Sequence, residues 1–319
     1  MKLYRNDEID PVQWNYFAGA HVFHRYEWRW VIGGAYGLTP CFAMAIEGER
    51  FALYPSFHVK GRCLSMPFTY LTGFLANSDE LCVGIQNALE GNGCSISYRV
   101  AEDIAGESGQ ITAVIKIDRL DDYLSGLPPK MRNQLRQADK QGYTLERQRD
   151  VEQFYPLYCR KMHEHGTPPH KRAFFEDTLR HFESAAVYTA FKDGLPAASM
   201  LCIDGEDTLQ NYRTRYILWA AAVSDKEAAY ANYFAYWSVI REAVAQGIMQ
   251  IDLGTALYGS TQYNFKKKWR PRFYTVRQIG GTDRHYKESR LMRLASRLWR
   301  HIPLGVVNVI GPQLRKYLP

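Results

Sequence analysis

The sequence lacks several features that would define a membrane-spanning, secreted or metal-binding protein. No apolar run approaches the roughly 20 residues that a transmembrane helix requires, and the first ten residues turn acidic where a signal peptide would turn apolar. The six cysteines form no Cys-x-x-Cys pair and show no Cys/His spacing of a zinc site. We therefore expect scattered core thiols in a reducing cytoplasm, and no metal.

Nucleophilic catalysis has no visible basis in the sequence either. No Ser/His/Asp or Cys/His arrangement stands out. An enzyme with this sequence is thus expected to transfer a group directly rather than through a covalent intermediate.

The composition is that of a soluble globular protein, with an uneven distribution of charge. The chain has 319 residues, enough for two ordinary domains, and 46% of them are apolar and 23% charged. Its net charge is +7, but residues 264–319 hold 14 Lys/Arg and only 2 Asp/Glu, so the remainder is mildly acidic. This asymmetry indicates one localised anionic partner.

One stretch, from Ile251 to Trp269, carries the strongest functional signal. Alternation predicts a short strand with Ile251 and Leu253 on one face and Asp252 on the other, at the strand's carboxyl end. Open α/β sheets bind their ligands at that end. Gly254 begins a glycine-containing loop that can approach a ligand closely.

A cationic turn ends this stretch. Lys266, Lys267 and Lys268 lie between Phe265 and Trp269. Three adjacent lysines leave open which of them faces a ligand, and a solvated loop beside a basic surface turn is the alternative interpretation.

The chain divides into three predicted units. Residues 118–129 combine aspartate, serine, glycine and proline, as linkers do. We predict an N-terminal α/β domain over 1–125, a second domain over 126–284 and a basic amphipathic tail over 285–319.

Two segments after this linker are candidate binding elements. Residues 130–140 form a predicted helix whose basic stripe, including Arg132 and Arg136, suits phosphate groups, although a solvated face is equally common. The loop that follows residue 162 holds His163, Thr167 and His170. Its Gly-Thr-Pro-Pro break keeps the two histidines off a common helix face, so a substrate-lining loop is more plausible than a metal site.

The second domain has the element order β-β-β-α-β. Strands are predicted at 185–191, 197–203 and 208–212, a helix at 228–246, and then the strand containing Asp252. An acyltransferase core of the GNAT type has this order, as do many other α+β folds.

From Lys130 to the end, the motifs together resemble the FemAB family. The matching motifs are Lys130…Arg132…Arg136…Gly142, His163-x-x-Gly-Thr-Pro-Pro with Phe174-Phe175, Tyr236-Trp237…Gly247, and Asp252-x-Gly254-Thr255…Gly259…Phe265-Lys266-x-x-Trp269. The terminal run from Leu298-Trp299 to Leu318-Pro319 is similar to the branch found beside exopolysaccharide and exosortase gene clusters.

The resemblance implies an α/β fold of two tandem GNAT-like domains with mixed sheets. It also implies an N-acyltransferase that moves an aminoacyl or acyl group to an amine of a peptidoglycan or exopolysaccharide precursor. No cofactor is implied beyond the co-substrate, which is aminoacyl-tRNA or acyl-CoA. An acyl-CoA-dependent transferase of exopolysaccharide biosynthesis and a non-catalytic nucleic-acid or lipid-binding module remain alternatives.

Residue roles follow from the matched positions. Lys266 would stabilise the oxyanion of acyl transfer, and Asp252 would orient the amine or accept its proton, unless it is a structural carboxylate that caps the Gly254 loop. The expected substrate-binding residues are Arg132, Arg136, His163, Thr167, His170, Tyr212, Tyr258, Tyr263 and Trp269.

Two departures from the family pattern are visible. The family usually has glycine after the tryptophan, whereas Arg270 stands here. No Arg/Gln-x-x-Gly-x-Gly/Ala segment precedes the helix at 228–246, where GNAT enzymes hold the pyrophosphate of acyl-CoA. Glu227-Ala-Ala-Tyr-Ala-Asn occupies that place, which counts against acyl-CoA as the donor.

The tail suggests a location. Its apolar residues fall on one helical face and its arginines on the other, which suits an anionic membrane surface. We therefore expect a cytoplasmic protein held at the inner face of the membrane, the alternative being a helix packed on the body. The apolar face comprises Leu291, Leu294, Ala295, Leu298 and Trp299, and the basic face Arg290, Arg293, Arg297 and Arg300.

Overall fold

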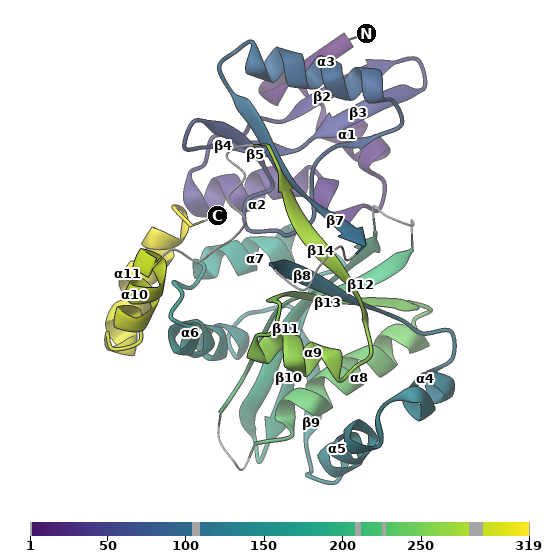
Figure 1. Ribbon diagram of the computed structural model, residues 1–319, viewed down its shortest axis with the longest axis vertical. Coiled ribbons are helices and arrows are strands. Elements are labelled where there is room, and N and C mark those ends of the chain that lie inside the picture. Colours follow the sequence, from purple (N-terminus) through teal and green to yellow (C-terminus); the bar gives the residue numbers. More distant parts are fainter. Residues whose placement is uncertain (1, 104–108, 208–211, 225–227, 281–289, 319) are drawn as a thin grey trace.

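Two sheets with flanking helices form the molecule (Figure 1). The computed structural model describes residues 2–103, 109–207, 212–224, 228–280 and 290–318. The smaller sheet has the order β1-β2-β3-β6. Its strands are β1 (Lys2–Arg5), β2 (Ala43–Glu47), β3 (Arg50–Tyr54) and β6 (Leu75–Ala76).

The larger sheet runs through most of the molecule in the order β4-β5-β7-β14-β8-β13-β12-β11-β10-β9. Its strands are β4 (Ser56–Val59), β5 (Arg62–Ser65), β7 (Ser95–Asp103), β8 (Gln110–Lys116), β9 (Thr144–Gln148), β10 (Ala186–Lys192), β11 (Leu195–Glu206), β12 (Arg213–Ala222), β13 (Gln250–Leu257) and β14 (Arg272–Ile279). Because β14 pairs with both β7 and β8, one sheet joins strands from both sides of the predicted boundary at residue 125. The domain division stays a prediction.

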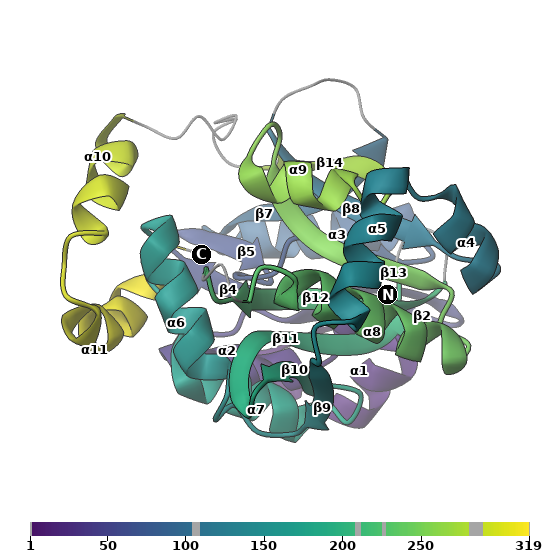
Figure 2. The same cartoon turned by 90° about the horizontal axis from the view of Figure 1, so that it is seen from below.

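Helices cover both faces of this sheet, as a second view shows (Figure 2). The α-helices of the described residues, on either sheet, are α1 (Pro11–Ala18), α2 (Glu27–Tyr36), α3 (Asp79–Glu90), α4 (Leu120–Gly126), α5 (Pro129–Asp139), α6 (Phe154–His165), α7 (Arg172–His181), α8 (Ala231–Ala245), α9 (Thr261–Lys267), α10 (Arg290–Trp299) and α11 (Leu304–Arg315). Alternation along β11 separates two cores: Leu201 packs with residues of α2, α6 and α7, whereas Met200 packs with residues of α5 and α8.

Most predicted elements of the second domain are present, with two corrections. The third strand is β12, at Arg213–Ala222, whereas residues 208–211 of the range predicted for it lie outside the described part of the chain. The cationic turn is a helix, α9, because the Ser260 side chain caps it by accepting a hydrogen bond from the Tyr263 amide.

The cysteines also differ from expectation. Cys159 and Cys202 are buried thiols, as predicted. Cys63 and Cys94 form a disulfide, and Cys41 lies beside them. The expectation of scattered thiols is wrong for these three, because pairing between distant strands brings them together.

Candidate functional site

The candidate site lies where two parallel strands separate. β12 and β13 pair only from Thr214 with Gln250 to Tyr216 with Asp252. Immediately beyond, β13 bulges away from regular pairing with β8, between Asp252 and Thr255. Gly254 forms this bulge with a φ of 75°, and a Cβ there would lie 2.9 Å from the Ile217 carbonyl oxygen. Both the positive φ and the close approach of the Ile217 carbonyl therefore require glycine at position 254.

The Asp252 side chain is buried beneath this bulge. Its Oδ1 accepts hydrogen bonds from the Gly254 amide, at 2.7 Å, and from the Thr112 hydroxyl, at 2.9 Å. The capping interpretation of Asp252 is thus visible in the geometry. A proton-accepting role stays a prediction.

Lys266 reaches the same bulge from α9. Its Nζ donates to the carbonyl oxygens of Leu253, at 2.6 Å, and Thr255, at 2.8 Å. Lys267 is exposed and Lys268 half-buried, with its Nζ donating to the Tyr233 hydroxyl. Of the three adjacent lysines, Lys266 is therefore the one that faces the separated strands.

Burial changes the charge equilibrium of both groups. It lowers the pKa of Lys266 to about 7, although the neighbouring Asp252 charge favours the ammonium form. Burial raises the pKa of Asp252, against the opposing effect of the Gly254 amide. A lysine that is about half-protonated at neutral pH can donate a hydrogen bond or exchange a proton there.

Two further residues of this site come from the first half of the chain. Thr112 lies on β8. Tyr70 is buried close to Asp252, and its phenol pKa is raised by burial first and by the charge of Asp252 second. Tyr70 lies in a loop with no motif around it, so sequence reasoning missed it. The pairing of β8 with β13 places Thr112 at the site, and the fold of the loop between β5 and β6 places Tyr70 there.

Arg132 and Arg136 both lie on α5. Arg136 is exposed, whereas Arg132 is half-buried and donates to the Ser125 carbonyl oxygen. Among the described residues, neither arginine has a hydrogen bond or ion pair with Asp252 or Lys266. Their phosphate-binding role stays a prediction.

The histidine loop leads into an aromatic cluster. His163 and Thr167 are half-buried near the end of α6, and His170 is buried among rings that include Phe68, Phe174 and Trp219. Burial, together with the charge of Arg315, lowers the pKa of His170 well below its usual range, so the ring is neutral.

The protein's own tail covers this histidine. Arg315 Nε donates to His170 Nε2 at 3.3 Å, so Nδ1 carries the proton and faces the Tyr36 hydroxyl at 2.5 Å. No hydrogen bond joins His170 to the Asp252 region among the described residues.

The predicted aromatic residues occupy different environments. Tyr212 is exposed and lies under the Lys116 ammonium. The Tyr258 ring packs at a tilt against Tyr263, which is buried near Phe273. Trp269 is fully buried against Tyr236 and Phe265.

The departure at Arg270 has a clear local consequence. Arg270 follows the end of α9 with a φ of 52°, the left-handed conformation that glycine adopts most easily. The turn that places Lys266 is therefore retained with a non-glycine residue, at a cost of roughly 1–2 kcal/mol. The Arg270 guanidinium donates to the Gly126 carbonyl oxygen and helps to hold the turn.

Comparison with known families defines the class of this protein. Residues 129–267 match the model of the acetyltransferase (GNAT) domain. This segment contains β12, α8, β13 and Lys266. The protein is therefore an acyltransferase with a GNAT domain. No curated protein sequence matches the chain.

Solved structures extend the similarity over most of the chain. FemX has a TM-score of 0.66 at 12% identity, covering 86% of this chain and 96% of that one. The C-terminal domain of a putative lysylphosphatidylglycerol synthetase from Agrobacterium fabrum has a TM-score of 0.55 at 12% identity, with coverages of 96% and 99%. L-PGS from Bacillus licheniformis has a TM-score of 0.54 at 14% identity, with coverages of 91% and 96%. The predicted likeness to FemAB proteins is confirmed for the fold, and the narrower exopolysaccharide branch stays a prediction.

Proposed function

We propose that this protein transfers an aminoacyl group from aminoacyl-tRNA to an amine of a cell-envelope precursor, where β12 and β13 separate. One observation carries the proposal: Lys266 is buried at this separation with two of its three ammonium protons directed to the Leu253 and Thr255 carbonyls. Those two bonds fix the direction of the third proton. A preorganised donor of this kind is what an oxyanion needs.

The reaction requires no covalent intermediate. The acceptor amine attacks the ester carbonyl of the donor, and the negative charge that develops on the carbonyl oxygen is stabilised by Lys266. Asp252, whose pKa is raised by burial, takes a proton from the attacking amine. Collapse then forms the amide, breaks the ester C–O bond and returns a proton to the leaving ribose oxygen.

The segment before α8 favours tRNA over acyl-CoA as the donor. Residues 223–230 read Val-Ser-Asp-Lys-Glu-Ala-Ala-Tyr, with no glycine and two carboxylates. Residues 225–227 of this segment, which include Glu227, lie outside the described part of the chain. The sequence itself disfavours a pyrophosphate, because it offers no glycine for close approach and would oppose its charge. The basic end of the chain suits a polyanion such as tRNA.

Donor binding tests this part of the proposal. The purified chain is titrated with aminoacyl-tRNA and, separately, with acyl-CoA across a salt series. We expect saturable tRNA binding that weakens with salt, and acyl-CoA binding at least about 100-fold weaker. Tighter binding of acyl-CoA would instead support an acyl-CoA-dependent transferase, and binding of neither would contradict the proposal.

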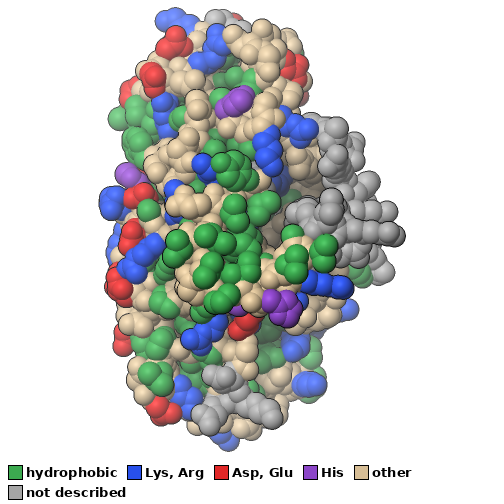
Figure 3. Space-filling view, turned by 90° about the vertical axis from the view of Figure 1, so that its left-hand side faces the viewer, with side chains coloured by type: hydrophobic (Ala, Val, Ile, Leu, Met, Phe, Trp, Pro, Cys, Tyr) green, Lys and Arg blue, Asp and Glu red, His purple; other side chains and the backbone are tan. Residues whose placement is uncertain are grey.

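The tail helices support a membrane-bound acceptor. Several apolar side chains of α10, α11 and the residues that follow α11 are exposed, and we call this set the tail surface. It comprises Leu294, Leu298, Val306, Val309, Ile310, Leu314, Tyr317 and Leu318. Figure 3 views the molecule from the side on which these helices lie, with hydrophobic side chains gathered on this face and Lys and Arg side chains beside them.

The charge of the tail supports an anionic partner for the tail surface. Residues 290–319 contain six Lys/Arg and no Asp/Glu. Exposed apolar groups bordered by cations suit an anionic bilayer surface. The side chains of Arg290, Leu291 and Arg293 lie outside the described residues, and Trp299 packs inward. Among the described residues, no helix is both long and apolar enough to cross a bilayer. We propose peripheral attachment through the tail surface.

Point substitutions test this attachment without removing helices that pack on the body. Changing Leu298 and Val309 to glutamine together is expected to reduce co-sedimentation with anionic vesicles at least about tenfold, because each exposed apolar side chain contributes roughly 1.5 kcal/mol or more on burial. The same change at Leu195, an exposed apolar residue at the start of β11, is the control. Equal vesicle binding by the double variant and the control would contradict the attachment.

A further inference from the structure

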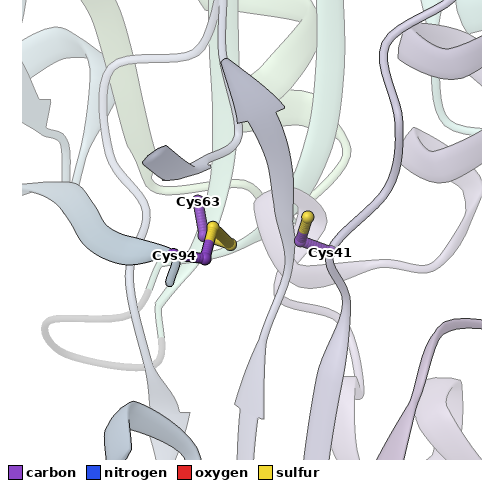
Figure 4. A group of neighbouring side chains, drawn as sticks. All are labelled: Cys41, Cys63 and Cys94. Carbon is purple, nitrogen blue, oxygen red and sulfur yellow. A yellow bond between two sulfur atoms is a disulfide. The ribbon is translucent and has the colours of Figure 1, made fainter. Parts of the chain in front are cut away.

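Three cysteines from distant parts of the sequence meet in the N-terminal half of the molecule. Cys41 precedes β2, Cys63 lies on β5 and Cys94 precedes β7 (Figure 4). The three sulfur atoms all lie within 4.8 Å of one another. Nothing in the proposed acyl transfer uses them, and they lie outside the segment that matches the GNAT model.

The cluster borders a cavity of about 290 Å³. Its lining includes Arg5, Cys41, His58, Cys63, Asn92 and Cys94. His58 on β4 is the direct antiparallel partner of Cys63, so both side chains leave the sheet on the same face. Cys41 is only half-buried, which gives an ion from solution a route to the sulfur atoms.

We propose that, in its thiol state, this cluster binds a zinc-type divalent ion through Cys41, Cys63, Cys94 and His58. Zn–S bonds of about 2.3 Å in a tetrahedron place ligand sulfurs about 3.8 Å apart, within the spread of the present cluster. Three thiolates and one imidazole form a common structural zinc set.

The charges of the cavity support this ligand set. Zinc with three thiolates and a neutral imidazole has a net charge of −1, and Arg5, a cationic residue, lines the same cavity. Thiolates are the ligands of such an ion, so the ion must displace the thiol protons on binding. Metal affinity is therefore expected to fall with decreasing pH.

Binding alternates with the disulfide seen in the structure. The Cys63–Cys94 bond leaves neither sulfur available as a thiolate ligand. A dithiol reductant that becomes a cyclic disulfide supplies two electrons and two protons, and so releases both thiols. The ion then takes the place of the thiol protons.

The position of the cluster indicates what the ion stabilises. Cys63 and Cys94 belong to the edge of the large sheet, where β5 runs parallel to β7. Cys41 leads into β2 of the small sheet, and its amide donates to the Ser56 carbonyl oxygen. A bound ion would therefore connect the two sheets, which the disulfide alone does not.

Cobalt binding to the full-length protein tests the proposal. The chain is reduced with a phosphine, desalted without oxygen and titrated with Co²⁺, and then with Zn²⁺. We expect one equivalent of Co²⁺ with a thiolate-to-cobalt charge-transfer band and the intense visible bands of a tetrahedral site, all lost when Zn²⁺ displaces it. The disulfide form is expected to show none of these bands.

Variants separate the cluster from other thiols. Cys41→Ser should weaken Co²⁺ binding by more than the 10–100-fold typical of losing a supporting residue. Cys82→Ser, at a half-buried thiol outside the cluster, should leave binding unchanged, and circular dichroism checks that both variants are folded. Absence of the charge-transfer band in the reduced protein, or its full retention in Cys41→Ser, would overturn the site. Unchanged visible bands in His58→Ala would remove His58 from the ligand set.

Discussion

Lys266→Met is expected to lower kcat for acyl transfer at least about 100-fold, the loss typical of removing one oxyanion donor. Methionine has a similar length and keeps the packing of α9 against β13, but it cannot donate to the Leu253 and Thr255 carbonyls. Amide formation with the donor that binds is the measurement. Lys267→Met, which alters an exposed neighbour on the same helix, should retain near-normal activity.

The pH dependence separates catalysis from a structural role. If the ammonium form of Lys266 stabilises the oxyanion, kcat falls as pH rises through the folded-state pKa of about 7. The folded-state pKa is below that of the unfolded chain, so unfolded lysine binds more protons between about pH 7 and 10.5. The free energy of unfolding should therefore rise with pH there, by up to about 1.4 kcal/mol per unit, and Lys266→Met should lack this slope. Retained kcat in Lys266→Met would show that the lysine only supports the bulge.

Asp204→Leu is expected to reduce the free energy of unfolding by about 3–5 kcal/mol. Arg215 is only 2% exposed, and its guanidinium binds both carboxylate oxygens of Asp204 at 2.7 and 2.8 Å. Removing the carboxylate leaves a buried cation whose nearest remaining carboxylate, on Glu242, lies 3.7 Å away. Urea denaturation measures the loss.

Two comparisons complete this experiment. The double variant Asp204→Leu with Arg215→Met removes both charges and should recover most of the lost stability. Asp122→Ala breaks the exposed pair with Arg119, so it should cost less than about 1 kcal/mol. A double variant less stable than Asp204→Leu would contradict the buried-charge explanation.

Local patterns were sufficient where an element depends on its own residues. The helices α5 and α8 and the order β10-β11-β12-α8-β13 were predicted, because hydrophobic periodicity and glycine stops act over a few residues. Where tertiary contacts override a local preference, the prediction failed. The strand predicted at 197–203 was expected to end there, yet β11 continues through Asp204 and Gly205 to Glu206, and Arg215 on the paired strand neutralises the aspartate.

The sequence by itself determined the acyltransferase motif, the strand that carries Asp252, and the basic amphipathic tail, since each depends on residues close together in the chain. Tertiary structure decided the rest. It inserted β14 between β7 and β8, brought Tyr70 and Thr112 to Asp252, selected Lys266 from three adjacent lysines and assembled three separated cysteines. These features depend on contacts between segments far apart in the chain, and local periodicity contains no information about which distant segment becomes a neighbour.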